Sequence, residues 1–224
     1  MGQTKMKRKQ FYDDGWTPIT GTFTYASATT INVSSGAAAI YSVGDKIRYQ
    51  NNDSGTWLYD YVITIADTLL TVAGDAVPNA TLTDAYYSKI EHPQGFPHIF
   101  SYTPVVTGNG GGTAPTYSVN DSKFTINGRL VTVFVLLYNP SGGTAGSGTQ
   151  ALIITMPVNE VSTYGTSVGI GISSESGGTV SGVLIRNFSS TQVYMVKPDS
   201  TTAILLNDQS SADRFIKFTY TYYI

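Results

Sequence analysis

The 224-residue chain contains no cysteine, which excludes a disulfide framework, thiolate chemistry and cysteine-ligated zinc. Only 12% of its residues are charged, about half the usual share. No apolar run approaches the roughly 20 residues that a membrane-spanning helix needs, so no membrane partner is expected. Helical bundles, coiled coils and disordered tails depend on Glu, Lys, Ala or a large net charge. The composition therefore argues against all three.

Hydroxyl groups take the place of charge, with 30 Thr, 22 Ser and 16 Tyr alongside 23 Gly. Short alternations of apolar and polar residues recur between turn-forming residues, which is typical of antiparallel β-sheets. The sequence Asn127-Gly128 between two such alternations predicts a tight hairpin. We predict an all-β chain with strands over residues 20–25, 30–34, 46–50, 56–65, 68–72, 85–90, 114–119, 123–126, 129–138, 150–156, 167–173, 179–188, 191–196, 202–206 and 214–224.

A proline-containing segment at residues 91–98 divides the chain. Its two prolines lack backbone donors and force extended conformations before each ring, so this segment is predicted to be a semi-rigid linker. Before it, we expect a small β-barrel or sandwich over residues 15–90. After it, residues 99–224 are predicted to form a jelly-roll-like antiparallel sandwich.

Residues 1–14 form a predicted N-terminal arm with an uneven charge. The four cations Lys5, Lys7, Arg8 and Lys9 lie within the first ten residues, whereas the other 214 residues carry nine basic and fifteen acidic side chains. Such an arm is either a solvated tail or a segment that docks on an acidic partner surface. Nucleic acid is not expected as the partner, because the acidic remainder offers no second basic face.

The predicted strand at residues 129–138 is apolar on both faces. One face carries Val131, Val133, Val135 and Leu137, and the other carries Leu130, Phe134, Leu136 and Tyr138. A strand in a two-layer antiparallel sandwich needs only one apolar face. The second face is therefore covered either by loops or the first domain, or by neighbouring subunits. The second alternative would make the chain an obligate oligomer.

Few residues suit catalysis or metal binding. The only histidines, His92 and His98, lie in the linker and are interpreted as surface or packing residues, because they lack the helical spacing or third ligand that zinc prefers. Acidic residues are scattered among turns and strand ends, with no spacing that predicts a glycosidase pair. We expect no catalytic, cofactor or metal site. An alternative use of Trp57 and the tyrosines is a platform on which sugar rings stack.

Several short runs resemble a module of structural proteins from tailed bacteriophages. They are GWTPIT at 15–20, FTYAS at 23–27, YSVGDKI at 41–47, DAYYS at 84–88 and PQGFP at 93–97. The lead-in TYSVND at 116–121 and the aromatic C-terminal strand are similar to the β-sandwich that these proteins carry at their distal end. The resemblance spans nearly the whole chain and brings no catalytic residues.

The resemblance implies a non-enzymatic virion component, assembled in the host cytoplasm and displayed on the particle surface, and it implies a homotrimer. Capsid decoration or a head fibre is the preferred role, with the N-terminal arm bound to capsid or tail proteins. A tail-associated protein that recognises host glycans is the first alternative. A sugar-processing enzyme is the second.

Overall fold

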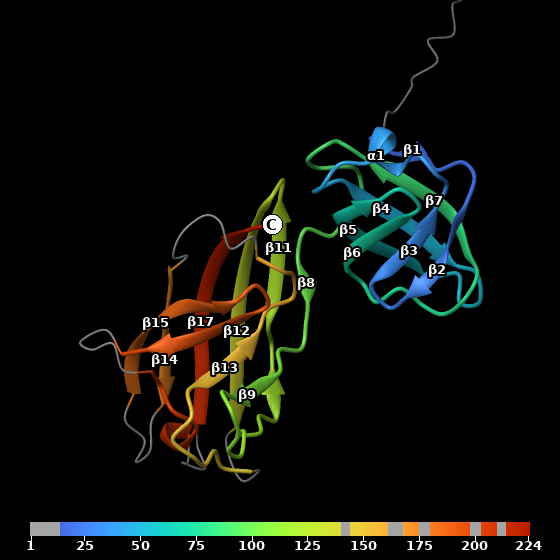
Figure 1. Cartoon of the computed structure of the whole chain (residues 1–224). Coiled ribbons are helices and arrows are strands. Elements are labelled where there is room, and N and C mark those ends of the chain that lie inside the picture. Colours follow the sequence, from blue (N-terminus) through green and yellow to red (C-terminus); the bar gives the residue numbers. More distant parts are fainter. Residues whose placement is uncertain (1–13, 140–143, 161–167, 175–179, 198–202, 210–213) are drawn as a thin grey trace, which may run out of the picture.

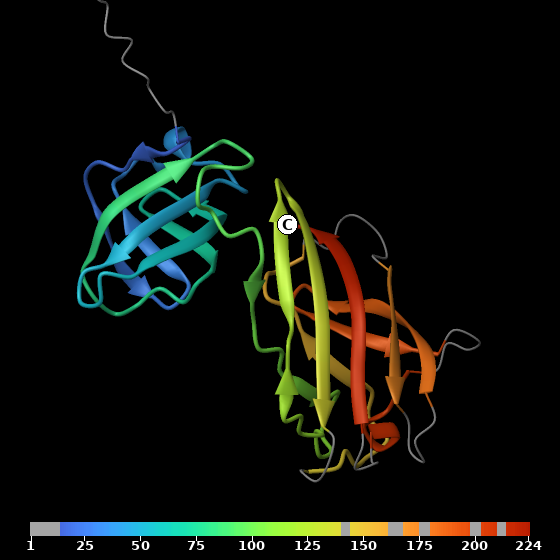
Figure 2. The same ribbon diagram turned by 180° about the vertical axis from the view of Figure 1, so that it is seen from behind.

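The structure is a computed structural model that describes residues 14–139, 144–160, 168–174, 180–197, 203–209 and 214–224. It confirms the all-β prediction. Two curled antiparallel sheets, one in each half of the chain, make two lobes joined by the linker (Figures 1 and 2). The described helices are one α-helical turn, α1 (Ala37–Ile40), and a short 3₁₀ helix, η2 (Leu206–Gln209).

The first sheet has seven strands: β1 (Thr17–Pro18), β2 (Phe23–Ser27), β3 (Thr30–Val33), β4 (Lys46–Asn51), β5 (Trp57–Ala66), β6 (Leu69–Gly74) and β7 (Leu82–Ser88). Their order across the sheet is β1-β7-β4-β5-β6-β3-β2. Successive strand residues point to opposite faces, so one face of each strand lines the core. That core contains Ile31, Ile47, Tyr49, Val62 and Leu70, all with no exposed surface.

Strand β5 is buried on both faces over residues 60–63, because it also packs against the linker and the second domain. Tyr61 and Ile63 belong to the same buried cluster as Phe96 of the linker and Phe100 of the second domain. The ring of Tyr61 lies edge-on to both phenylalanines, with centroids 4.9 and 5.6 Å apart. These contacts hold the two domains together at the point where the linker passes from one to the other.

The second sheet has ten strands: β8 (Phe100–Ser101), β9 (Val106–Gly108), β10 (Val119–Asn120), β11 (Lys123–Asn127), β12 (Leu130–Asn139), β13 (Leu152–Thr155), β14 (Val168–Ser174), β15 (Val180–Ser189), β16 (Gln192–Val196) and β17 (Arg214–Tyr223). Nine of them follow the order β8-β11-β12-β17-β14-β15-β16-β13-β9, and β10 adds to β12. The C-terminal β17 is thus inserted between β12 and β14 (Figure 1).

The predicted hairpin is confirmed, since β11 and β12 pair antiparallel through Asn127 and Leu130, with Gly128 at φ 58°. Most of the predicted strands are also confirmed. Two are wrong. Residues 114–118 form no strand, consistent with the missing N–H of Pro115, and in 203–206 only two isolated bridges form, at Ala203 and Leu205.

A buried carboxyl group lies inside the first domain. Asp60 of β5 is fully buried, and its Oδ2 accepts a hydrogen bond of 2.8 Å from the Tyr49 hydroxyl. Burial, together with the nearby Asp75 carboxylate, raises the pKa of Asp60 well above its usual range. The pairing of Asp60 with Gly74 places the neighbouring Asp75 close to it, a proximity that the sequence spacing did not predict.

We expect Asp60→Asn to stabilise the protein at neutral and alkaline pH. Folded Asp60 keeps its proton to a higher pH than the unfolded chain does, so its contribution to the stability of the wild type falls as pH rises above about 4, until the folded group also ionises. The amide has no proton to lose. The thermal midpoint of the variant should exceed that of wild type at pH 8 and match it at pH 4, as measured by circular dichroism.

Asp67→Asn is the matched control, and its expected effect on stability at pH 8 is the opposite of that of Asp60→Asn. Hydrogen bonds from the Ser35 hydroxyl and the Gly36 N–H lower the pKa of this exposed carboxyl, so its ionised form stabilises the fold above pH 4. The control variant should lose stability at pH 8. Equal midpoints for wild type and Asp60→Asn at pH 8 would contradict the assignment.

Candidate interaction surfaces

Strand β14 has its side chains arranged in the reverse of the usual pattern. Gly169 and Gly171 face the interior of the second domain, whereas Ile170 and Ile172 face outward and are 72% and 40% exposed. The inward glycines are required by the neighbouring strand β17. A β-carbon at Gly169 would overlap the carbonyl oxygen of Thr219, and one at Gly171 would overlap the β-carbon of Phe218.

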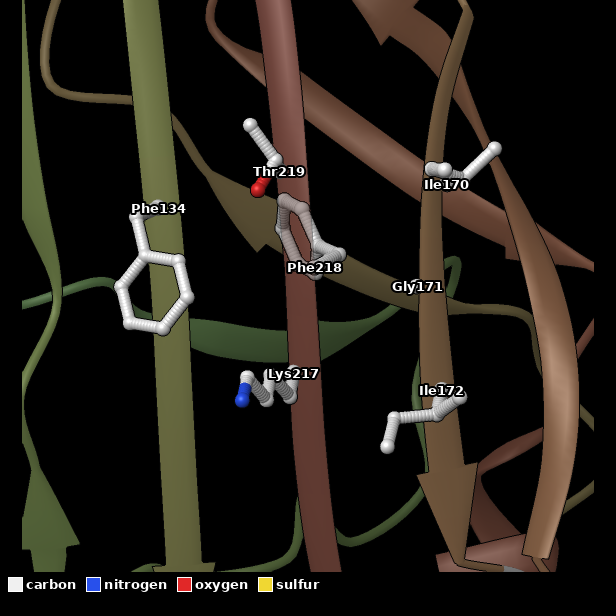
Figure 3. Close-up of a pocket in the computed structure, with 7 residues that line it drawn as sticks. All are labelled: Phe134, Ile170, Gly171, Ile172, Lys217, Phe218 and Thr219. Carbon is white, nitrogen blue, oxygen red and sulfur yellow. The ribbon is translucent and has the colours of Figure 1, made fainter.

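The outward isoleucines form one side of a groove that runs over β17 (Figure 3). Phe134 of β12 forms the opposite side, and Lys217 and Thr219 of β17 lie between them. The groove has a volume of about 330 Å³. The Lys217 Nζ lies 5.8 Å from the centre of the Phe134 ring, within reach of a cation–π contact. The groove is therefore mainly apolar, with one ammonium group and one hydroxyl.

A second hollow of about 200 Å³ lies on the other side of Phe134. Its lining includes Thr125 and Thr132 together with Ile99, which is 64% exposed. Phe134 therefore stands as a ridge between two hollows on the outer face of the second sheet. We call this region, made of Phe134, Ile170, Ile172, Lys217, Thr219 and Ile99, the outer face.

The structure places the four predicted subunit-interface residues on one side of β12. Leu130, Phe134, Leu136 and Tyr138 are half-buried there, alternating with fully or almost fully buried residues on the inner side. Phe134 borders both hollows. Ile170 and Ile172 were missed in the sequence, although their alternation with glycines was a usable signal. Glycines at alternate positions of a strand lie on one face and leave it without side chains. The apolar residues between them therefore lie on the opposite face.

In the first sheet, a cluster of aromatic rings surrounds Arg48 of β4. The guanidinium carbon of Arg48 lies 4.6 Å from the ring centres of Trp16 and Tyr86 and 5.3 Å from that of Trp57. The same guanidinium donates a 3.1 Å hydrogen bond to the Asp14 carboxylate. We call these five residues the Arg48 cluster.

The two histidines of the linker pack against each other. The rings of His92 and His98 meet edge-on with centroids 4.7 Å apart, and His98 also contacts the ring of Phe96. Burial, followed by the nearby His92, lowers the pKa of His98. Glu91 lies 3.8 Å from His92, but in the described part of the chain no three His, Asp or Glu side chains come together as a metal site would require.

The predicted anchoring residues Lys5, Lys7, Arg8 and Lys9 lie outside the described residues, which begin at Asp14. Asp14 is joined to the first domain through Arg48. Its neighbour Gly15 lies beside Ile90 and Pro93, where the linker begins. The point at which the arm meets the first domain is thus defined, even though the arm's cations are not described.

Fold and surfaces together define a two-domain all-β protein with an apolar groove on one domain and an aromatic cluster on the other. Comparison with protein-family models and with curated proteins found no match for this chain. In the described ranges, no helix has the length and apolar character needed to span a bilayer.

We expect Gly171→Ala to destabilise the second domain by about 1–3 kcal/mol, because the added methyl group would overlap Phe218 and the Lys217 carbonyl in a tightly packed core. Chemical denaturation followed by circular dichroism measures the change. Ser190→Ala, in the exposed turn between β15 and β16, is the control and should stay within about 0.5 kcal/mol of wild type. Equal stability of the two variants would contradict the close approach of β14 and β17.

Proposed function

We propose that the chain is a non-enzymatic structural protein of the bacteriophage particle surface, with capsid decoration or a head fibre as the preferred role. In this proposal the first domain attaches to the particle through the N-terminal arm, and the second domain assembles with copies of itself. The observation that carries the proposal is the apolar outer face of the second domain. The sequence resemblance described above supports the phage assignment.

The outer face favours self-assembly because its apolar groups gain by leaving water. Burying an isoleucine or phenylalanine side chain contributes about 1.5–3 kcal/mol. Ile170 and Ile172 are exposed and lie side by side along β14, with Phe134 across the groove. A ridge between two hollows also gives a shape that an adjoining subunit can match. Clustered apolar groups of this kind mark protein interaction sites more often than isolated exposed residues do.

The charges on the outer face favour a ring-like arrangement over a twofold pairing. Lys217 lies in the middle of the groove and is exposed. A twofold contact brings the same patch of both subunits together, which would place two Lys217 ammonium groups near each other. A threefold ring lets the groove of one subunit meet a different patch of the next. The homotrimer implied by the resemblance fits this requirement.

A trimer predicts a light-scattering mass of about three times the 24.0 kDa chain mass at micromolar concentration. The double variant Ile170→Asp with Ile172→Asp should yield the single-chain mass with an unchanged circular dichroism spectrum, because both side chains point away from the core. Ile40→Asp is the control, since Ile40 is 39% exposed on the first domain and should leave the mass at three chains. A wild-type mass of 24 kDa would overturn the assembly proposal.

Attachment through the arm predicts that removal of residues 1–10 abolishes binding to particles that lack the protein, while folding is preserved. Replacing the four arm cations by Gln should weaken binding, and replacing the three lysines by Arg should preserve it. Binding should also decrease with salt, since exposed charges are screened within about 10 Å at 0.1 M. Electron microscopy of particles labelled with gold-conjugated antibody then distinguishes head from tail. Normal decoration by the truncated protein would exclude the arm as the anchor.

A further inference from the structure

Trp57 is unusual among the aromatic residues of the first domain. It is 38% exposed, whereas every other aromatic side chain in residues 14–90 is buried or half-buried. Trp57 begins β5, on the same face as Tyr59 and Tyr61, which are covered by the linker and the second domain. An aromatic stripe therefore runs out from beneath the linker and ends in solvent at Trp57.

The exposed end of this stripe is held in place. Arg48 is fixed from one side by the Asp14 carboxylate, and its guanidinium lies against three aromatic rings. The rings of Trp57 and Tyr86 are 6.2 Å apart, inclined at 44°. Side chains that are already ordered lose little conformational entropy on binding, so more of their contact energy appears as affinity.

The backbone beside Tyr86 is strained. Asp84 has φ 46°, the only positive φ of a non-glycine residue among those described, and it lies at a bulge in the pairing of β7 with β4. Bulges of this kind redirect neighbouring side chains, and strained backbone is found preferentially at functional sites. The bulge occurs between the pairs Arg48–Tyr86 and Gln50–Thr83, directly next to the Arg48 cluster.

We propose that the Arg48 cluster is a docking hot spot for a protein of the particle surface, a proposal that rests on the function proposed above. Trp, Tyr and Arg are the residue types that most often dominate protein interfaces. The cluster includes Asp14, and the arm leaves the first domain there. The arm and Trp57 therefore approach the same partner. That partner presents an apolar pocket for the Trp57 ring and, beside it, carboxylates for the four arm cations.

The position of the cluster favours a particle protein over a host glycan. A surface at the base of the anchoring arm faces the particle, whereas a receptor glycan would be met at the distal end. Sugar rings also stack on exposed aromatic side chains such as Trp57. Carbohydrate binding is therefore one of the outcomes that the experiment distinguishes.

The test uses full-length protein and particles of the encoding phage assembled without it, with binding measured by co-sedimentation. Trp57→Ala should weaken binding at least tenfold, because loss of a hot-spot side chain costs more than a decade in affinity. The matched control is Phe188→Ala, which removes an aromatic ring that is 41% exposed on the second domain. It should bind as wild type does. Circular dichroism and light scattering should show an unchanged fold and oligomeric state for both variants.

Fluorescence gives an independent measurement, because the chain has only two tryptophans and Trp16 is buried. Because Trp57 is the exposed one of the two, the emission of the wild-type protein should shift to shorter wavelength when particles are added. It should not shift with purified cell-surface polysaccharide of the host. A shift with the polysaccharide and none with particles would overturn the docking proposal in favour of a carbohydrate surface.

The failures can be told apart. If wild-type protein does not bind the particles, the proposed function fails. If wild type binds and Trp57→Ala binds equally well, attachment uses the arm alone and the hot-spot inference is wrong. If truncation of residues 1–13 by itself changes the emission of Trp57, the arm covers the tryptophan and the inference is also wrong.

Discussion

The close approach of β14 to β17 is the constraint on which the outer face depends. No β-carbon fits between these strands at Gly169 or Gly171, so the inner face of β14 has no side chains at these two positions. The large side chains of the strand, Ile170 and Ile172, are consequently on the outside. In most half-buried strands the apolar residues pack inward and the polar ones face water. Here the packing of the second domain itself creates an apolar outer surface.

A second constraint is the aromatic junction between the domains. Tyr61, Phe96 and Phe100 join β5, the linker and β8 in one buried cluster. Backbone contact at Gly44 and Gly128 brings the first domain against the β11–β12 hairpin, with no space for a side chain at Gly44. The linker is thus more than a spacer, because its phenylalanine completes the packing between the two domains.

The two surfaces lie on different domains and differ in chemistry. The outer face consists mainly of aliphatic side chains and Phe134, with Lys217 and Thr219 between them, and it suits the burial of apolar area. The Arg48 cluster combines a charged pair with three rings and lies where the N-terminal arm joins the first domain. Under the function proposed above, the outer face would mediate assembly and the Arg48 cluster would mediate attachment. This division would also allow several weak attachments on one oligomer to add up to firm binding.

How much could be predicted from sequence depends on the range of the interaction. Alternation and turn residues act over a few positions, so composition and pattern determined the all-β class, the Asn127-Gly128 hairpin and the two apolar faces of β12. Only the tertiary structure decided that Asp60 lies beside Asp75, that Arg48 lies between Trp16 and Tyr86, and that β17 closes against β14. The last two contacts join residues distant in the chain, and a local pattern carries no information about which distant strands become neighbours. Asp60 and Asp75 belong to the hairpin of β5 and β6, where the bulge between Val62 and Thr64 decides which residues face each other.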